Sequence, residues 1–265
     1  MISLEGRHAI VTGATQGLGA DIAERLHQAG ARLTIAGRDP ERGEAIAARL
    51  GEGALFVETD IADDGSIAAC VTAAMARFGR IDFLVNNACM YDDRGMAATR
   101  AEWRRLFDVN LFGAAIFSAA VADHMAGDGC AIVNIGSIGG KSGATGRMLY
   151  PASKAALLQI TKSMAITLAP RGIRVVSVSP AVTWSPSVEK SAGSIEVADR
   201  LGAVLHPLGR IGRGHEVADA VLFACSPMAS FITGTDIAVD GGFTAIGPDQ
   251  GLGPRLWMDA DLHRD

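Results

Sequence analysis

Short apolar runs alternate with longer segments of helical periodicity along the chain. The runs are rich in β-branched residues and are bounded by Gly, Asp, Asn or Ser, which is typical of buried strands. We expect strands at His8–Thr12, Arg32–Ala36, Leu55–Val57, Ile81–Val85, Ala131–Ile135, Arg174–Val178 and Asp236–Val239. We expect helices at Gly19–Gly30, Pro40–Leu50, Asp63–Gly79, Ala101–Ala126 (broken near Asn110), Tyr150–Ala169 and His215–Cys225. This alternation predicts an α/β fold, a doubly wound parallel sheet of about seven strands with helices on both faces.

The 265 residues read as one domain. No repeat, low-complexity run or Pro/Ser-rich linker divides the chain, and 49% hydrophobic residues suffice for a large core. We therefore expect a single domain over residues 1–265. Within it, residues 185–212 are expected to form a helix-poor substrate loop region and residues 247–265 an irregular C-terminal arm, where substrate or a second subunit would make contact.

Composition excludes several classes of function. The net charge of −5 argues against a broad basic surface for nucleic acid. The chain has no run of ~18 uninterrupted apolar residues, so we expect no membrane span. The N-terminus lacks the features of a signal peptide, which predicts a cytoplasmic protein. The histidines and cysteines show no metal-ligand spacing, so no metal site is expected.

A glycine-rich turn follows the first expected strand. Its sequence, TGATQGLG, runs from residue 12 to residue 19 and enters a helix. In an open parallel sheet this turn takes a dinucleotide pyrophosphate: Gly13 allows the tight turn, Gly17 the approach of phosphate and Gly19 close helix packing. The alternative is a tight turn without a ligand. The cofactor-binding residues expected here are Gly13, Thr15, Gln16, Gly17, Leu18 and Gly19.

The second and third strands end beside the expected adenosine. An acidic residue at the end of strand two would select NAD, but Gly37 stands there and Arg38 follows, which favours the 2′-phosphate of NADP. Asp39 would be a helix cap or a ribose ligand, and Arg38 would alternatively be a solvated surface residue. Asp60, followed by Ile61, is placed to accept a hydrogen bond from the adenine amine; its alternative role is a helix cap for the segment at residue 63.

Four polar residues fall at strand ends or on the adjacent helices. Tyr150 and Lys154 lie one helical turn apart, so the ammonium would lower the phenol pKa from ~10 toward a working value. Ser137 ends the fifth strand, and Asn110 interrupts a helix where Asn has poor propensity. A Tyr–Lys pair alone is common, but the serine on the preceding strand end makes the combination specific.

Together with NNAC at residues 86–89, these motifs resemble the short-chain dehydrogenase/reductase family over nearly the whole chain. The resemblance implies a Rossmann-type oxidoreductase in which Tyr150 is the general acid/base. It implies that Lys154 lowers the tyrosine pKa and binds the nicotinamide ribose, and that Ser137 binds the substrate oxygen. Asn110 would hold a water, the helix kink and a proton relay to Lys154. NADP(H) is the favoured cofactor, and NAD(H) is the alternative.

Some positions depart from the family pattern. Cys89 stands where Gly is usual, Ala181 replaces another Gly, and Ser185 takes the place of a Thr that contacts the carboxamide. We still expect cofactor binding. The spacing of four between the tyrosine and the lysine argues against the related enoyl reductases, and the length argues against extended sugar-nucleotide epimerases. The remaining cofactor contacts that the resemblance implies are Asn87, Ala88, Tyr150, Lys154, Pro180, Thr183 and Ser185.

The expected reaction interconverts a secondary alcohol and a ketone. Alternatives are a 3-oxoacyl thioester reductase, or a non-catalytic cofactor-binding regulator. A sugar, polyol or cyclic alcohol would each suit the first reaction, while an acyl carrier partner would require a basic patch that the balanced charges of residues 185–212 do not suggest. The resemblance also implies a homotetramer, with helices 101–126 and 150–169 between subunits.

The substrate pocket is the least determined part of the site. Met90, Met148 and Trp184 are candidates for its wall, as are Tyr91 and Leu149, although isolated apolar residues serve equally often as core. Three cations lie near the same loops and would suit an anionic substrate, although exposed charges are usually only solvated. These are Arg94, Lys141 and Arg147.

Overall fold

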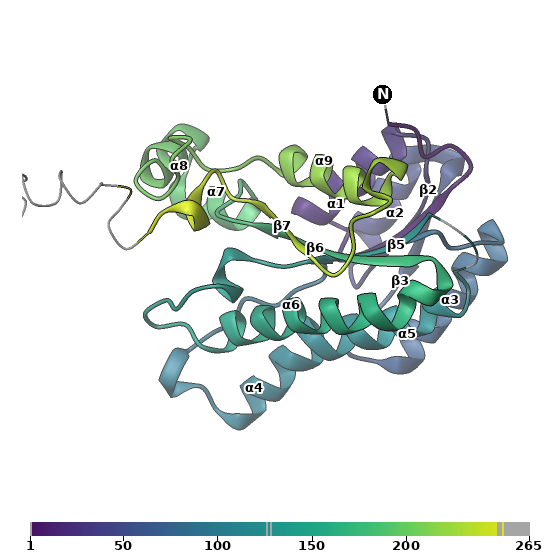
Figure 1. Ribbon diagram of the computed structural model, residues 1–265, viewed down its shortest axis with the longest axis horizontal. Coiled ribbons are helices and arrows are strands. Elements are labelled where there is room, and N and C mark those ends of the chain that lie inside the picture. The colour runs from purple at the N-terminus through teal and green to yellow at the C-terminus, as the bar shows by residue number, and fades with distance from the viewer. Residues whose placement is uncertain (1, 126, 128, 248–250, 252–265) are drawn as a thin grey trace, which may run out of the picture.

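Seven parallel strands form one sheet in the described part of the chain, in the order β3-β2-β1-β4-β5-β6-β7. The computed structural model describes residues 2–125, 127, 129–247 and 251 (Figure 1). The expected C-terminal arm therefore lies almost entirely outside the described residues. The strands are β1 (His8–Thr12), β2 (Arg32–Gly37), β3 (Ala54–Glu58), β4 (Phe83–Asn86), β5 (Cys130–Ile135), β6 (Ile173–Pro180) and β7 (Asp236–Val239). The α/β doubly wound fold is confirmed.

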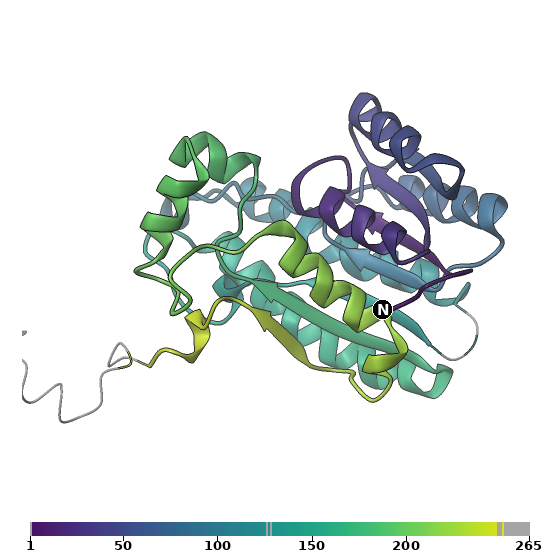
Figure 2. The ribbon, with the colours of Figure 1, turned by 90° about the horizontal axis from the view of Figure 1, so that it is seen from above.

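Helices cover both faces of this sheet (Figures 1 and 2). On one face lie α1 (Gly17–Gln28), α2 (Pro40–Leu50) and α9 (Gly214–Cys225), and on the other α3 (Asp64–Phe78), α4 (Arg100–Phe107), α5 (Ala114–Ala122) and α6 (Leu149–Leu168). A six-residue π-helical segment, Asp108–Gly113, joins α4 to α5 and is the break expected near Asn110.

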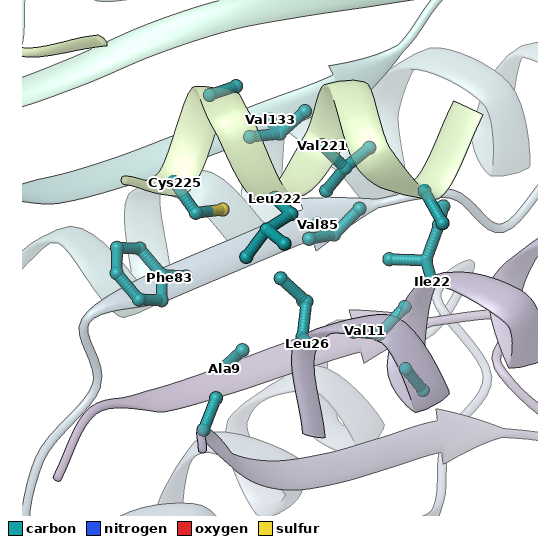
Figure 3. Packing of buried hydrophobic residues seen from close by; sticks show 14 of the residues in the cluster. Ala9, Val11, Ile22, Leu26, Phe83, Val85, Val133, Val221, Leu222 and Cys225 are labelled. Atoms are coloured by element: carbon teal, nitrogen blue, oxygen red, sulfur yellow. The ribbon is translucent and has the colours of Figure 1, made fainter. Parts of the chain in front are cut away.

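Each strand contributes to two cores because successive side chains point to opposite faces. In β1, Ala9 and Val11 pack under α1 and α9, where Leu26 and Leu222 meet the sheet (Figure 3). Ile10, between them in the sequence, belongs to the core on the opposite face. The strands therefore read as nearly continuous apolar runs, as expected for a sheet covered on both sides.

The expectation that residues 185–212 would be helix-poor is wrong. Two short helices occupy this segment, α7 (Pro186–Ala192) and α8 (Ile195–Gly202), and they stand at one end of the sheet (Figures 1 and 2). Each begins at a serine whose hydroxyl accepts a backbone N–H three residues on: Ser185 from Val188 and Ser194 from Val197, both at 3.4 Å. Helices of about two turns give too little periodicity to be recognised from the sequence, but their serine caps were visible.

The helical stretch Arg100–Ala122 is, by length and composition alone, apolar enough to cross a membrane, with a mean hydropathy of 1.4. A core helix passes the same test, and 44% of that apolar window is buried inside this protein. Its apolar character is explained by packing: Phe117 and Val121 of α5 are fully buried in the core beneath the sheet.

The strand order reverses between β2 and β4, the two neighbours of β1. The connections from β1 and from β4 leave the sheet toward opposite faces, and such a point opens a crevice at the carboxyl ends of the strands. The glycine-rich turn after β1 and the NNAC segment after β4 both lie at this point. The fold therefore brings the two predicted cofactor motifs together.

Candidate active site

The glycine-rich turn is packed directly against the end of β4. Gly13 has a φ of +62°, and a Cβ there would come within 2.8 Å of the Ala88 Cα. The Asn87 amide donates to the backbone oxygens of Thr12 (2.9 Å) and Gly13 (3.3 Å), which fixes the turn from the side of β4. A Cβ at Gly19 would collide with the Gly13 oxygen. Gly13 and Gly19 thus have the geometric roles expected of them, and Asn87 positions the turn.

The N-terminus of α1 is left open for an anion. Its N-cap residue, Gln16, makes no side-chain capping bond, and no acidic residue stands in the first turn. By contrast, α2, α3 and α4 are capped by the side chains of Asp39, Asp63 and Thr99. Uncapped N–H groups at the positive end of a helix dipole match a pyrophosphate. The turn therefore fits the dinucleotide expected there.

Two arginines lie at the end of β2 and the start of α2, where the adenosine is expected. Arg38 is exposed at the end of β2, and a Cβ at Gly37 would lie 2.6 Å from the Thr15 methyl, so an acidic side chain does not fit there. Asp39 is engaged as the N-cap of α2, accepting the Arg42 N–H at 3.0 Å. The Arg42 guanidinium contacts both Asp39 (3.3 Å) and Gln16. Arg42 was not predicted; its position in the first turn of α2 was the signal available.

Asp60 and Ile61 follow β3 near the same crevice. Asp60 is exposed, and its carboxylate accepts the Ala62 N–H at 3.0 Å. The alternative role of Asp60 as a helix cap is wrong, because Asp63 caps α3 by accepting the Ser66 N–H at 2.8 Å. Ile61 is buried against the π-helical segment, where Gly113 leaves no room for a Cβ beside the Ile61 oxygen.

Tyr150, Lys154 and Ser137 meet at the carboxyl end of β5. Tyr150 and Lys154 lie on one face of α6 and are nearly buried, with 8% and 3% of their surface exposed. The ammonium lies 5.7 Å from the centre of the phenol ring and donates to the Ile135 oxygen at 2.6 Å. Ser137 lies two residues after Ile135, beyond Gly136, and is also buried. The structure thus brings together the three residues that the sequence singled out.

The electrostatics of Tyr150 differ from the expectation. Burial raises the pKa of its phenol above the ordinary value, while Lys154, the Ser137 hydroxyl and Arg147 act in the opposite direction. The lysine thus acts on the phenol pKa in the expected direction, while the desolvation of a phenolate by burial acts more strongly in the opposite direction.

Asn110 occupies the π-helical segment and is 2% exposed. Its carboxamide accepts the Met90 N–H at 2.7 Å and donates to the Met90 oxygen at 2.9 Å and to the Ser153 hydroxyl at 3.2 Å. The π-helical segment directs this side chain between α6 and the segment after β4. Its hydrogen bonds there account for the kink between α4 and α5. Its part in a relay to Lys154 stays a prediction.

Asp93 is a functional residue that the sequence did not reveal. Its carboxylate accepts the backbone N–H groups of Met148 and Tyr150, each at 2.9 Å, and of Gly95 at 2.9 Å. Although partial burial acts against it, these hydrogen bonds lower the pKa of Asp93 below its ordinary value. Asp93 therefore caps the helix that carries Tyr150 from a distant loop. In the sequence, its pairing with Asp92 indicated only a turn.

The rim around Tyr150 is part aromatic and part cationic. The Tyr91 ring stacks on the Tyr150 ring with centres 5.2 Å apart, and the Arg147 guanidinium lies 4.8 Å from the same ring. Met148 is 39% exposed. Leu149, a candidate for the pocket wall, is instead fully buried in the core.

The segment after β6 approaches the glycine-rich turn. Pro180 pairs with Val239 of β7, the Thr183 hydroxyl donates to the Ala181 oxygen at 3.1 Å, and Trp184 is half-buried. Ser185 caps α7, whose Pro186 lies 3.5 Å from where a Gly17 Cβ would be. The described residues contain no group of three or more His, Cys, Asp or Glu side chains placed to hold a metal ion.

Comparison with known proteins places these features in context. A family model described as "Enoyl-(Acyl carrier protein) reductase" matches residues 13–244. The chain is 38% identical over 246 residues to a cis-4-hydroxycyclohexanecarboxylate dehydrogenase of Sinomonas cyclohexanicum. The matched region covers 91% of this chain and 97% of the dehydrogenase.

Two solved structures from Brucella melitensis, each 33% identical in sequence, are similar in fold. One is a short-chain dehydrogenase/reductase described as a glucose/ribitol dehydrogenase, with a TM-score of 0.85 over 91% of this chain and 98% of that chain. The other is a 3-ketoacyl-(acyl-carrier-protein) reductase complexed with NADH, with a TM-score of 0.83 over 91% and 100%.

Proposed function

Because the chain belongs to the short-chain dehydrogenase/reductase family of NAD(P)-dependent oxidoreductases, we propose that it interconverts a secondary alcohol and the corresponding ketone. The observation that carries this proposal is the convergence of Ser137, Tyr150 and Lys154 at the carboxyl end of β5, on the same edge of the parallel sheet as the open N-terminus of α1. These side chains supply a proton carrier, a cation and a hydroxyl at one place. That is the set a carbonyl–alcohol conversion requires.

The groups present fit a nicotinamide dinucleotide. The free N–H groups of α1 would bind its pyrophosphate, Lys154 would bind the nicotinamide ribose, and the segment of Pro180, Thr183 and Ser185 would contact the carboxamide end. When bound, the nicotinamide supplies or accepts the hydride at its C4 atom. Asp60, Ile61 and Ala88 would border the adenine and the adjacent backbone.

The preferred cofactor in this proposal is NADP(H). Arg38 is exposed directly after β2, and Arg42, in the first turn of α2, contacts Asp39 and Gln16, so two arginines near the end of β2 would be available to a ribose 2′-phosphate. Asp39 accepts hydrogen bonds within α2 and is less available as a ribose ligand. NAD(H) is the alternative.

Tyr150 moves the proton in this mechanism. In the reductive direction its Oη donates a proton to the carbonyl oxygen, and in the oxidative direction its phenolate takes the proton of the alcohol. The Ser137 hydroxyl holds the substrate oxygen as its charge changes, and the Lys154 ammonium stabilises the phenolate. The relay toward solvent would run from Lys154 through a water at Asn110, whose Oδ1 keeps one lone pair beside its bond to the Met90 N–H.

A 3-oxoacyl thioester reductase is the second candidate, because a protein of that name shares this fold at a TM-score of 0.83. An acidic carrier protein would need free cations near α8. There, Arg210 pairs with Glu216 and Arg213 with Asp199, both at 2.6 Å. The matching family model has the description of an enoyl reductase, but the spacing of four between Tyr150 and Lys154 favours the alcohol reaction. A non-catalytic regulator would have no need of the complete Asn110, Ser137, Tyr150 and Lys154 set.

The substrate that we propose is a cyclic secondary alcohol. The curated relative that is 38% identical is a dehydrogenase of a hydroxycyclohexane derivative, and the exposed Met148 and the Tyr91 ring offer apolar surface to a saturated ring. Met90 and Trp184 complete the wall. Polyols are the alternative, and parallel assays with cyclohexanol derivatives, sorbitol and acetoacetyl-CoA separate the three classes.

Tyr150→Phe tests the proposed mechanism. We expect turnover to fall by at least about a thousandfold, because the proton carrier is removed, while cofactor affinity stays within a few-fold. Tyr91→Phe is the matched control, since Tyr91 is the only other tyrosine of the chain and phenylalanine keeps the stacked ring. This variant should retain more than about a tenth of the wild-type activity, because the Tyr91 hydroxyl has no part in proton transfer. Near-full activity in Tyr150→Phe would contradict the mechanism.

We further propose a cytoplasmic homotetramer that does not bind nucleic acid, metal or membrane. The helices expected between subunits expose Phe112, Ile116 and Ile166. Apolar side chains of this size on the surface are consistent with contact between subunits. Light scattering of the purified protein measures the assembly directly.

A further inference from the structure

The sequence singles out three cations on the loops near Tyr150, namely Arg94, Lys141 and Arg147, and two of them form ion pairs. The Lys141 ammonium pairs with the Asp236 carboxylate at 2.6 Å, and Arg94 pairs with Glu102 at 3.4 Å. Arg147 makes no ion pair with any residue that the structure describes. In a chain with a net charge of −5, this side chain is an available positive charge at the mouth of the site.

The backbone fixes Arg147 beside Tyr150. Its N–H donates to the Ala144 oxygen at 3.3 Å, closing a tight turn, and the next residue, Met148, is tied by its N–H to the Asp93 carboxylate. Its guanidinium then lies 4.8 Å from the centre of the Tyr150 ring. The cation is therefore held against the ring whose hydroxyl would handle the proton.

Asp93, which is tied to this turn, attracts Arg147 electrostatically but forms no ion pair with it. The Asp93 carboxylate accepts three backbone N–H groups, two of them at the start of α6. It thereby offsets the positive end of that helix. The ring contact leaves the N–H fork of the guanidinium with unused donors, because a face-on cation–π contact uses the charge and none of the hydrogen-bonding edges.

We infer that Arg147 binds a carboxylate of the substrate, so that the enzyme acts on hydroxy acids or oxo acids in which the carboxylate stands a few bonds from the reacting carbon. This inference rests on the proposed function. A guanidinium pairs with a carboxylate through two parallel N–H···O bonds, which fixes both the position and the orientation of the ligand. In this proposal the carboxylate lies on Arg147 and the reacting carbon lies at the Tyr150 and Ser137 hydroxyls.

A merely structural role for Arg147 makes a different prediction. If the guanidinium only stabilised the Tyr150 ring or its ionised form, removing it would affect charged and neutral substrates equally. A carboxylate-binding role affects only ligands that carry the charge. The difference between a carboxylate and its uncharged amide therefore isolates the proposed interaction.

The test uses cyclohexanecarboxylate and cyclohexanecarboxamide as probes, titrated calorimetrically into the protein saturated with NADPH and, separately, with NADH. The wild type should bind the carboxylate at least about tenfold more tightly, since hydrogen bonds between charged groups are the stronger class. Arg147→Gln should abolish this preference while changing amide binding less than about threefold. Arg147→Lys should retain part of it, and the matched control Arg94→Gln, whose arginine is paired with Glu102, all of it.

Equal binding of the two probes by the wild type, no measurable binding of either, or a preference that survives Arg147→Gln would overturn the inference. Turnover of 4-hydroxycyclohexanecarboxylate and of its amide separates this failure from that of the proposed function. Equal turnover of both would support the alcohol reaction and contradict the role of Arg147. Carboxylate binding that depends on Arg147, without turnover of any alcohol, would support the carboxylate site and contradict the proposed reaction.

Discussion

Asp93→Ala should lower both the free energy of unfolding and the kcat of the protein. The substitution removes the carboxylate that accepts the N–H groups of Met148 and Tyr150 at the start of α6. A lost helix cap costs ~0.5–2 kcal/mol, and the lost charge at the positive end of the helix adds ~0.3–1 kcal/mol. Because Asp93 is only partly buried, we expect a loss of about 2 kcal/mol in the free energy of unfolding, or roughly 4–8 °C in Tm for a chain of this size.

The same variant should also lower kcat. Tyr150 is one of the residues whose backbone Asp93 fixes, and a displacement of about 1 Å at a reacting group costs up to ~100-fold in rate. We expect a fall of at least about tenfold in kcat with little change in the affinity for cofactor, because Asp93 contacts neither the glycine-rich turn nor Lys154. Asp93→Asn keeps one acceptor oxygen and should lie between the two.

Thermal and urea unfolding, with steady-state kinetics, measure both effects. Asp92→Ala is the matched control, since the neighbouring Asp92 is exposed and its side chain makes no hydrogen bond to the described residues. The pKa of Asp93 is lowered, so its contribution to stability is present above the ordinary value of about 3.9 and disappears as the pH falls through the lowered pKa. Equal Tm and kcat in Asp93→Ala and Asp92→Ala would refute the role given to Asp93.

Two further predictions concern other parts of the fold. Burial lowers the pKa of His8 to about 4, so the folded protein binds fewer protons than the unfolded chain between that pH and the ordinary ~6.5. The free energy of unfolding should therefore fall by on the order of 3 kcal/mol as the pH drops through this window. Urea unfolding at several pH values should show this fall in the wild type and a flatter profile in His8→Gln. Arg38→Ala should weaken NADPH binding about tenfold and leave NADH binding within about twofold, because an exposed arginine contributes a screened contact to the 2′-phosphate. Calorimetry that shows equal losses of affinity for both cofactors would contradict the assignment of Arg38 to the 2′-phosphate.

Local rules of sequence were enough to predict the sheet and the positions of Tyr150, Lys154 and Ser137. Buried parallel strands carry continuous apolar runs, and the active-site residues lie at the ends of strands or one helical turn apart. The residues that were missed act across the chain: Asp93 caps a helix 57 residues away from its own loop, and Arg42 reaches back to Gln16. Such contacts depend on how loops meet after folding, which no local spacing encodes.

The electrostatics were also only partly predictable. The i, i+4 spacing indicated that Lys154 would favour the phenolate of Tyr150, and the cation does act in that direction. The sequence did not reveal how deeply the phenol is buried, and burial is the larger effect. The short helices α7 and α8 were missed for another reason, since two turns carry too few residues to establish a period.

Titration of the wild-type protein with NADPH and with NADH tests the central claim most directly, because the whole proposal depends on a nicotinamide cofactor at the open end of α1. We expect saturable binding with one site per chain, and tighter binding of NADPH than of NADH. Tighter binding of NADH would contradict the assignment of Arg38 and Arg42 to a 2′-phosphate. A titration in which neither cofactor binds would contradict the proposed function itself.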